Sequence, residues 1–255
     1  MTKSLSELMR AKMSSYNTFA LFYDSLTENV DYKVRSKYIS DFFCKYNKTN
    51  CSVLDLACGT GSISKFLSEY GYQVIGMDLS EDMLTVAAGK NIKNAQFLKA
   101  DMTDFRLAQK ADCCVCSLDA INHLTEYFDV CRCFENVSNS LNKGGIFVFD
   151  VNTIYKHREI LCDNTFAFDE EDFFLSWDNH YTDNDIVEIF LDFFVFNGKN
   201  YDRFSENFKE RAYSIEELTQ ALTDNSFEIL GIYDELTLDC PKEDSERIYF
   251  VCRRK

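Results

Sequence analysis

The chain has 255 residues, of which 46% are hydrophobic and 27% charged, and its formal net charge is −15 at pH 7. This composition is typical of a folded globular protein, and no apolar run approaches the roughly 20 residues that a membrane-spanning helix needs. The acidic balance argues against a nucleic-acid partner, because phosphates are contacted by lysine and arginine. The N-terminus lacks the apolar core of a signal peptide, so we expect a cytoplasmic protein without a membrane partner.

The N-terminal region, residues 5–46, is expected to be helical. Apolar side chains recur there at three- and four-residue spacing, as in the set Tyr16, Phe19, Ala20 and Tyr23. This spacing gives each helix one apolar face that can pack against the rest of the chain.

Strand and helix patterns alternate between Cys51 and Asp150. The expected strands are 51–56, 72–78, 95–99, 112–118 and 144–151, and the expected helices lie near 62–70, 80–90 and 125–141. Strands separated by single helices favour right-handed crossovers and a parallel sheet with helices on both faces. The fold class is therefore α/β.

A glycine-containing turn follows the first of these strands. The run Asp55-Leu-Ala-Cys-Gly-Thr-Gly-Ser62 leads from a strand into a helix, and Gly59 and Gly61 allow a ligand to approach the backbone closely. Unpaired N–H groups at the start of the helix face that ligand. Asp78 ends the next strand, 19 positions after Gly59, where a carboxylate can hold a ribose. The pattern predicts a ligand that contains adenosine.

The eleven cysteines are expected to be reduced and mostly buried, because the chain shows no export signal. Cys113 and Cys116 have the spacing of a metal-binding pair. On a strand, however, residues three positions apart point to opposite faces of the sheet. The core interpretation is therefore favoured over a zinc site, and no metal is expected.

Residues 163–213 break the alternation of strands and helices. The segments 173–177, 186–196 and 201–213 are rich in aromatic and β-branched residues, and 197–200 has the composition of a hairpin turn. We expect an antiparallel insertion here. Ser214 and Glu217 then form a capping box that opens a helix to about residue 223, and strands follow at 227–233 and 247–253.

The glycine turn and its flanks resemble a known family. Val53-Leu-Asp-Leu-Ala-Cys-Gly-Thr-Gly61 is similar to motif I of the class I S-adenosylmethionine (SAM)-dependent methyltransferases. The resemblance implies a Rossmann-like seven-stranded sheet, SAM as cofactor and S-adenosylhomocysteine as product. It implies an N-terminal helical cap over the cofactor (1–48), a SAM-binding core (49–154 and 214–255) and an antiparallel β insertion that covers the acceptor site (155–213).

The resemblance also assigns residues to the parts of SAM. Asp78 would hold the ribose, and Leu79 and Met83 would pack on the adenine. Asp101 and the backbone N–H of Met102 would bind the polar edge of the adenine. Further cofactor-binding residues, expected near the amino-acid end of SAM or over it, are Tyr16, Tyr23, Asp55, Ala57, Gly59, Gly61 and Ser117. For the polar residues, a purely structural role such as capping is the alternative, and for the two tyrosines it is plain helix packing.

His123 is the candidate catalytic residue, because an imidazole that titrates near neutral pH can accept a proton from an amine. A structural histidine is the alternative. The candidate acceptor-binding residues follow nearby strands or lie in the insertion, and they are Asn122, Asp150, Asn152, Trp177 and Arg203. For each of these, a role in terminating a strand or packing a sheet is the alternative.

The predicted function is transfer of the SAM methyl group to a small molecule, and we expect the acceptor atom to be an amine nitrogen. The aromatic insertion and the segment from Asp101 to Leu107 resemble small-molecule N-methyltransferases, including those that act on amino sugars. Two alternatives stay open: an oxidoreductase that uses a nicotinamide cofactor, which the lack of a third glycine disfavours, and a SAM-binding protein without catalysis. The expected assembly is a monomer or a homodimer.

Overall fold

The computed structural model describes residues 18–27, 29–171 and 173–255. Its centre is a seven-stranded sheet with the order β10-β11-β5-β4-β1-β2-β3. The strands are β1 (Ser52–Leu56), β2 (Gln73–Asp78), β3 (Ala95–Lys99), β4 (Ala111–Cys116), β5 (Leu141–Asn152), β10 (Phe227–Asp234) and β11 (Arg247–Arg254). Pairs among β1 to β5 are parallel, whereas β11 runs antiparallel to both β5 and β10. The α/β fold class and the seven-stranded Rossmann-like sheet are confirmed.

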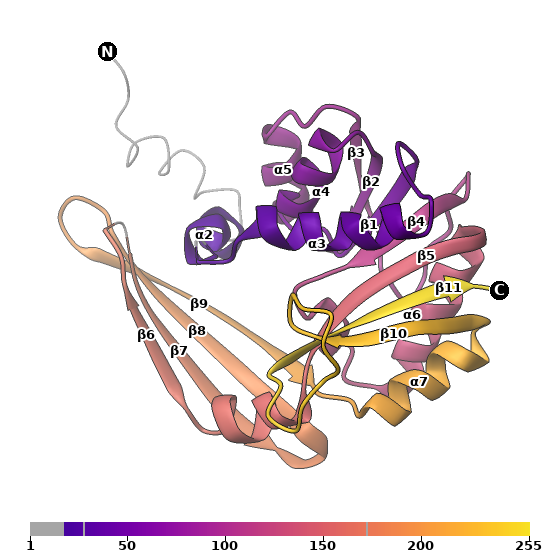
Figure 1. The fold of residues 1–255 in the computed structure, drawn as a ribbon. Coiled ribbons are helices and arrows are strands. Elements are labelled where there is room, and N and C mark those ends of the chain that lie inside the picture. Colours follow the sequence, from indigo (N-terminus) through magenta and orange to yellow (C-terminus); the bar gives the residue numbers. More distant parts are fainter. Residues whose placement is uncertain (1–17, 28, 172) are drawn as a thin grey trace.

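Helices cover both faces of this sheet (Figure 1). The helices are α2 (Thr18–Leu26), α3 (Tyr32–Lys45), α4 (Ser62–Glu69), α5 (Glu81–Gly89), α6 (Tyr127–Ser140) and α7 (Ile215–Asp224). One core contains Phe134 and Leu218 from α6 and α7, and the other contains Phe43 and Leu67 from α3 and α4. Cys113 packs in the second core and Cys116 in the first, as strand periodicity predicts.

A second, four-stranded antiparallel sheet forms the insertion and extends away from the first (Figure 1). Its order is β6-β7-β8-β9, and its strands are β6 (Thr165–Asp169), β7 (Phe173–Thr182), β8 (Ile186–Phe196) and β9 (Tyr201–Arg211). The hairpin turn between β8 and β9 closes with a 2.9 Å bond from Asn197 N–H to the Asn200 carbonyl. Leu175, Ile189 and Phe193 pack on the face that meets Phe22 of α2.

The segment that follows β5 contains elements that the sequence did not predict. They are η2 (Lys156–Leu161), a single π-helical turn that precedes the second sheet, and β6, the first strand of that sheet. A 3-10 turn, η3 (Asp183–Asp185), joins β7 to β8. The capping box at Ser214 is confirmed, with both of its hydrogen bonds present.

The strand expected at 112–118 is shorter in the structure. It ends at Cys116, and Leu118 and Asp119 adopt left-handed backbone conformations with φ of 60° and 53°. A short 3-10 helix, η1 (Ala120–His123), follows at once. A left-handed conformation costs free energy in residues with a Cβ, so the surrounding contacts must hold this turn in place.

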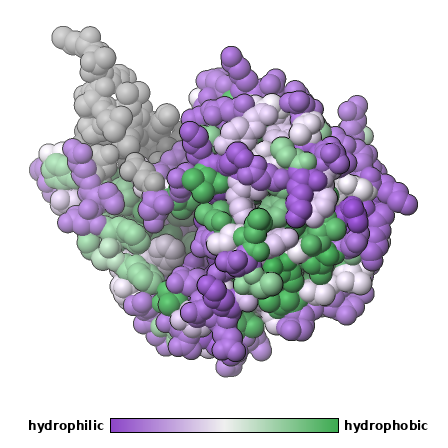
Figure 2. All heavy atoms as spheres, in the orientation of Figure 1, coloured by the Kyte–Doolittle hydropathy of each residue, from purple (hydrophilic) through white to green (hydrophobic). Residues whose placement is uncertain are grey.

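The surface in view is mostly hydrophilic, in agreement with the composition (Figure 2). In the space-filling view hydrophilic residues cover most of the periphery, and hydrophobic residues gather toward the middle of the face shown (Figure 2). No helix in the part of the chain that the structure describes is long and apolar enough to cross a membrane.

Candidate functional site

The glycine turn lies where β1 passes into α4, at the carboxyl edge of the parallel strands, where open α/β sheets bind ligands. Ala57, Gly59 and Gly61 all have positive φ, at 56°, 54° and 77°. A Cβ on Gly61 would lie 3.0 Å from Phe97 and 3.2 Å from Ala87, so this glycine lets α4 pack closely. A Cβ on Gly59 would meet no atom within 4 Å. The turn therefore leaves open space beside Gly59, on the side where a ligand can approach.

Asp78 connects the ends of the first two strands. Its Oδ2 accepts a 2.8 Å hydrogen bond from the N–H of Gly59, and its Oδ1 accepts one of 2.8 Å from the N–H of Ser80. Ser80 in turn caps α5, because its hydroxyl accepts from the N–H of Met83 at 3.3 Å. These bonds fix the direction of the carboxylate beside the open turn.

The residues expected around the adenine lie at neighbouring strand ends. Leu79 follows β2 with 64% of its surface exposed, whereas Met83 on α5 is buried. Asp101 follows β3 and is exposed; its Oδ1 accepts 2.7 Å bonds from both the N–H and the hydroxyl of Thr103. The structure thus shows the capping role for Asp101 that its sequence also allowed. Met102 packs at the edge of the core.

Asp55 lies behind the glycine turn and is 2% exposed. Its carboxylate accepts a hydrogen bond from the hydroxyl of Ser64, which joins β1 to the first turn of α4. Burial, with a smaller contribution from Asp78, raises the pKa of Asp55 to about 7. In this structure Asp55 therefore has a structural role, because it holds the start of α4 against the end of β1.

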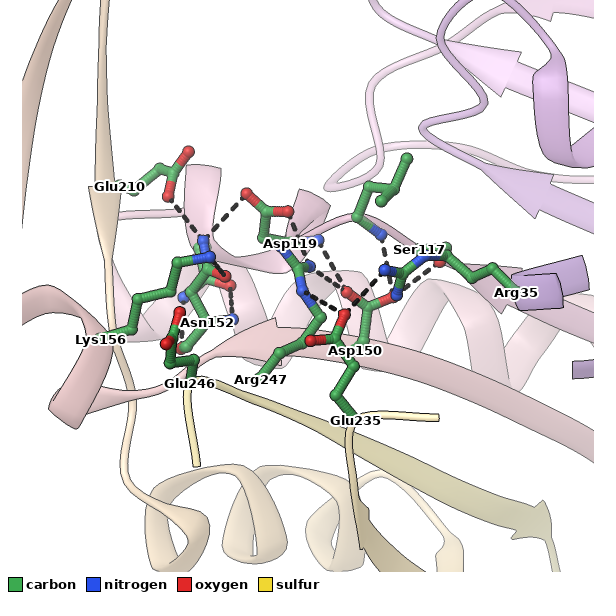
Figure 3. Close-up of polar contacts among 12 residues, drawn as sticks. Arg35, Ser117, Asp119, Asp150, Asn152, Lys156, Glu210, Glu235, Glu246 and Arg247 are labelled. Carbon is green, nitrogen blue, oxygen red and sulfur yellow. Dashed lines mark hydrogen bonds and ion pairs between the residues drawn. The ribbon is translucent and has the colours of Figure 1, made fainter. Parts of the chain in front are cut away.

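Asp150, at the end of β5, organises the turn after β4 (Figure 3). It is fully buried and accepts bonds from the Ser117 hydroxyl at 2.7 Å, the Leu118 N–H at 2.9 Å and the Asp119 N–H at 3.1 Å. Arg247 of β11 donates to Asp150 and lies 2.8 Å from Asp119. These contacts hold the left-handed turn. Burial alone would raise the pKa of Asp119, but Arg247 lowers it to about 2.

Asn122 and Asn152 are buried and have structural partners. The amide of Asn122 donates to the carbonyls of Asn152 at 3.0 Å and Arg211 at 2.9 Å, and its oxygen accepts from the Asn152 N–H. Asn122 therefore clamps η1 to β5 and β9. The Asn152 amide donates to Asp119 at 3.0 Å, and Lys156 donates to the Asn152 oxygen at 3.1 Å (Figure 3). Direct acceptor binding by Asn122 or Asp150 finds no support in this geometry, since their polar atoms are already engaged.

Glu210 of β9 is a central residue of the site that the sequence analysis missed. It is 4% exposed, and the Asn152 amide lies 3.3 Å from its Oε2 (Figure 3). Its Oε1 lies 3.8 Å from Nε2 of His123, and its Oε2 lies 3.8 Å from Nε2 of His157. Burial and then the charge of Asp119 raise the pKa of Glu210 to about 7. The alternation of side chains along β9 could have identified it, because Phe204, Phe208 and Glu210 are an even number of positions apart and so face the same, inward side of the sheet.

His123 ends η1 with 44% of its side chain exposed, and its ring centre lies 5.1 Å from that of Phe208. It thus combines access from solvent with a buried carboxylate behind it. Its helix η1 directly follows the turn at Leu118 and Asp119, and Asn122 bonds this helix to the end of β5.

The insertion residues Trp177 and Arg203 lie apart from this group. Trp177 packs on Phe166 and Phe168, and its indole N–H donates to Asn179 at 2.8 Å. Arg203 is 61% exposed at its side chain and forms a two-pronged pair with Asp192. It alternates with the inward residues of β9, so it lies on the opposite face of the sheet from Glu210.

Helix α2 is joined to the glycine turn by Asp24. The carboxylate accepts from the Thr60 hydroxyl at 2.6 Å, and Lys90 of the α5 end lies 2.7 Å away. At the preceding residue, burial raises the pKa of Tyr23 well above its ordinary value, and Tyr32 and Asp119 add to this. Tyr16 lies outside the described residues.

Comparisons with known proteins agree on the family. A family model described as a methyltransferase domain matches residues 53–145. The protein YqeM of Bacillus subtilis (strain 168), which is named as a methyltransferase, is 34% identical over 244 residues, or 94% of this chain and 97% of YqeM. The chain belongs to the SAM-dependent methyltransferases. A crystal structure of a SAM-dependent methyltransferase from Clostridium acetobutylicum ATCC 824 superimposes with a TM-score of 0.85 at 33% identity, covering 92% of this chain and 97% of that one.

The name of one further relative of this methyltransferase also states a substrate and the atom that is methylated. The dTDP-3-amino-3,4,6-trideoxy-alpha-D-glucopyranose N,N-dimethyltransferase of Streptomyces venezuelae is 32% identical over 135 residues, which cover 52% of this chain and 55% of the relative.

The cofactor of this methyltransferase is SAM, and the residues present fit it. The open space at Gly59 admits a ligand, the fixed carboxylate of Asp78 offers acceptors to a diol, and exposed Leu79 offers an apolar surface to a base. The family assignment removes the nicotinamide-dependent oxidoreductase from the alternatives.

Proposed function

We propose that this methyltransferase transfers the methyl group of SAM to the amine nitrogen of a small molecule. The observation that supports this most is the pairing of a solvent-accessible imidazole, His123, with the buried carboxylate of Glu210, in the 3-10 helix that follows β4 and in β9. An amine must be neutral to act as a nucleophile, and such a pair can take up its proton. The amino-sugar N,N-dimethyltransferase among the relatives supports an amine acceptor, through a match of about half the chain.

In this proposal the cofactor extends along the carboxyl edge of the sheet. Asp78 holds the ribose, Leu79 and Met83 enclose the adenine, and Asp101 with the Met102 N–H binds its polar edge. The backbone of Ala57, Gly59 and Gly61 holds the amino-acid end, with Ser117 and Tyr23 nearby; Tyr16 is proposed from the sequence alone. When bound, SAM supplies an electrophilic methyl group on its sulfonium. The residues of the chain position the acceptor, since alignment accounts for much of the catalysis in such reactions.

The domain roles follow from the same proposal. Residues 1–48 cap the cofactor, to which the Asp24 contact with Thr60 contributes. Residues 49–154 and 214–255 bind SAM, and residues 155–213 cover the acceptor. The part of the insertion that we assign to the acceptor is the inward face of β9 near Glu210. Trp177 supports that sheet by packing, and Arg203 is not retained as a contact.

A screen of small primary and secondary amines, amino sugars among them, tests the proposed function. We expect formation of S-adenosylhomocysteine together with a methylated amine that carries the added mass on nitrogen. Replacing His123→Ala should lower kcat about 100-fold if the imidazole is the base. The matched control is His180→Gln, an exposed histidine on β7 that packs on Phe190. Methylation of hydroxyl or carbon acceptors with no amine turnover would overturn the proposal, as would SAM binding without any transfer.

A further inference from the structure

Glu210 lies between two histidines that belong to different elements. Its two carboxylate oxygens face one imidazole each: Oε1 faces Nε2 of His123 in η1, and Oε2 faces Nε2 of His157 in η2, both at 3.8 Å. His157 is fully buried, in contrast to His123. The arrangement is thus a row of three titratable groups that runs from solvent into the protein.

The protonation of His157 can be deduced from its partners. Its Nδ1 lies 2.9 Å from the backbone carbonyl of Asp185, which can accept but not donate, so Nδ1 carries a hydrogen. Its Nε2 is buried and has no hydrogen-bond partner among the described residues. In the neutral imidazole this Nε2 presents a lone pair toward Oε2 of Glu210. A lone pair facing an ionised carboxylate is unfavourable, so this contact favours a proton on either Nε2 of His157 or the carboxylate of Glu210.

The surroundings of Glu210 favour a shared proton. The groups that face it are the two histidines, Asp119 of the turn after β4, Asn152 of β5, Lys156 of η2 and Arg247 of β11. Burial raises the pKa of Glu210 to about 7 and lowers the pKa of His157. The two groups therefore compete closely for one proton, and the pair is neutral overall whichever of them holds it.

We propose that Glu210 and His157 share one buried proton, and that Glu210 thereby holds His123 with its Nε2–H directed at Oε1, leaving Nδ1 of His123 as the basic atom. This inference deepens the proposed function and rests on it for the identity of the acceptor. His123 touches the acceptor and is the catalytic residue. Glu210 and His157 act through it and are positioning residues.

The proton transfer balances within the chain. An N–H bond of the acceptor ammonium breaks, and its proton forms a bond to Nδ1 of His123, which leaves the nitrogen lone pair free for methylation. The resulting imidazolium is stabilised by Glu210 in its ionised form, in which the shared proton is held by His157. The proton then leaves to water from the exposed edge of His123. An oriented imidazole backed by a carboxylate is the arrangement by which many enzymes activate a base.

Nitrogen-15 NMR of the imidazoles tests the inference without any acceptor. The chain has three histidines, so His180→Gln assigns the exposed one and leaves two signals to interpret. We expect His157 to carry its proton on Nδ1 and to show a partly protonated Nε2, and we expect His123 as the Nε2–H tautomer near pH 7. A His123 that populates both tautomers freely, or a His157 with a bare Nε2, would overturn the inference.

Glu210→Gln provides the kinetic test. Glutamine can still present an oxygen to His123 and an N–H to His157, so both histidine contacts are kept while the negative charge, the shared proton and the Asn152 bond to Oε2 are lost. We expect kcat to fall about 10- to 100-fold, with a changed pH profile and an unchanged dissociation constant for SAM. Unchanged kcat and pH profile with an amine acceptor would overturn the inference and leave the proposed function intact. The expected tautomers without methylation of any amine would overturn the proposed function and leave the proton-sharing pair intact.

Discussion

The backbone N–H of Gly59 donates a 2.8 Å hydrogen bond to Oδ2 of Asp78, which ties the turn after β1 to the end of β2. The other carboxylate oxygen accepts from the N–H of Ser80. Two strand ends and the start of α5 are therefore aligned by one side chain. A carboxylate held in this way is preorganised to accept further bonds from a ligand on its open side.

Asp78→Asn should weaken SAM binding about 10- to 100-fold, because an amide nitrogen would face one of the two backbone N–H donors and disturb the turn. Calorimetric titration with SAM measures the effect. Glu69→Gln, at an exposed carboxylate in the last turn of α4, is the control and should leave the affinity within a factor of two. An unchanged affinity in Asp78→Asn would remove this residue from the proposed cofactor site.

Alanine at each of the two turn glycines should separate folding from binding. Both positions have positive φ, which costs about 1 kcal/mol or more for alanine. At Gly61 the new Cβ also crowds Phe97 and Ala87, so Gly61→Ala should lose about 1 to 3 kcal/mol more in the free energy of unfolding. Gly59→Ala has open space and should remain the more stable of the two, yet lose SAM affinity. Urea unfolding and SAM titration together check this, and equal stability losses would contradict it.

Asp150→Ala should be severely destabilising. It removes a fully buried carboxylate, leaves two backbone N–H groups without their acceptor and takes from Arg247 one of its two aspartate partners, and breaking a buried ion pair costs roughly 3 to 5 kcal/mol. The matched control is Arg253→Gln in the exposed pair with Glu228, which should cost about 1 kcal/mol or less. Chemical denaturation of both variants gives the comparison. A loss in Asp150→Ala as small as that of the control would show that the turn is held in another way.

Asp55 should make the protein less stable as the pH rises. Its folded-state pKa of about 7 is above the ordinary value near 3.8, so its contribution to stability is fully present below about pH 4 and is lost as the pH rises through 7. Each pKa step of one corresponds to about 1.4 kcal/mol, so the full change is a few kcal/mol. Asp55→Asn should flatten the free energy of unfolding between pH 4 and 8. An identical pH dependence in wild type and variant would show that Asp55 stays ionised.

The sheet and its coverage could be predicted because each of the first five strands carries a strong local signal. The apolar stretches around Val53 and Val115, the turn glycines and the capping box at Ser214 act within a few residues. The end of β4 could not be predicted in the same way. Leu118 leaves the sheet because Asp150, 32 positions away along the chain, accepts its N–H.

The candidate site was only partly predictable for the same reason. Asp78, His123 and Ser117 follow strands whose ends meet at one edge, so their place follows from the order of elements. The partners of His123 do not. Glu210 and His157 come from the insertion and from a π-helical turn, and only the folded chain brings them to η1. Asn122 and Asp150 were correctly placed at the edge, but bonds to backbone groups and Arg247 now account for their polar atoms.

The position of β11 has a consequence for how the chain acquires its structure. This strand inserts between β5 and β10, both of which precede it in the sequence, and it carries the arginine that binds Asp119 and Asp150. During synthesis β10 is therefore made before β11, the strand with which it pairs. The edge of β5 that pairs with β11 stays unpaired until about 100 further residues have been added. Such distant pairing slows folding. Because Arg247 binds both Asp119 and Asp150, we expect the turn after β4 to take its final shape only once β11 has joined the sheet, well after the glycine turn has been synthesised.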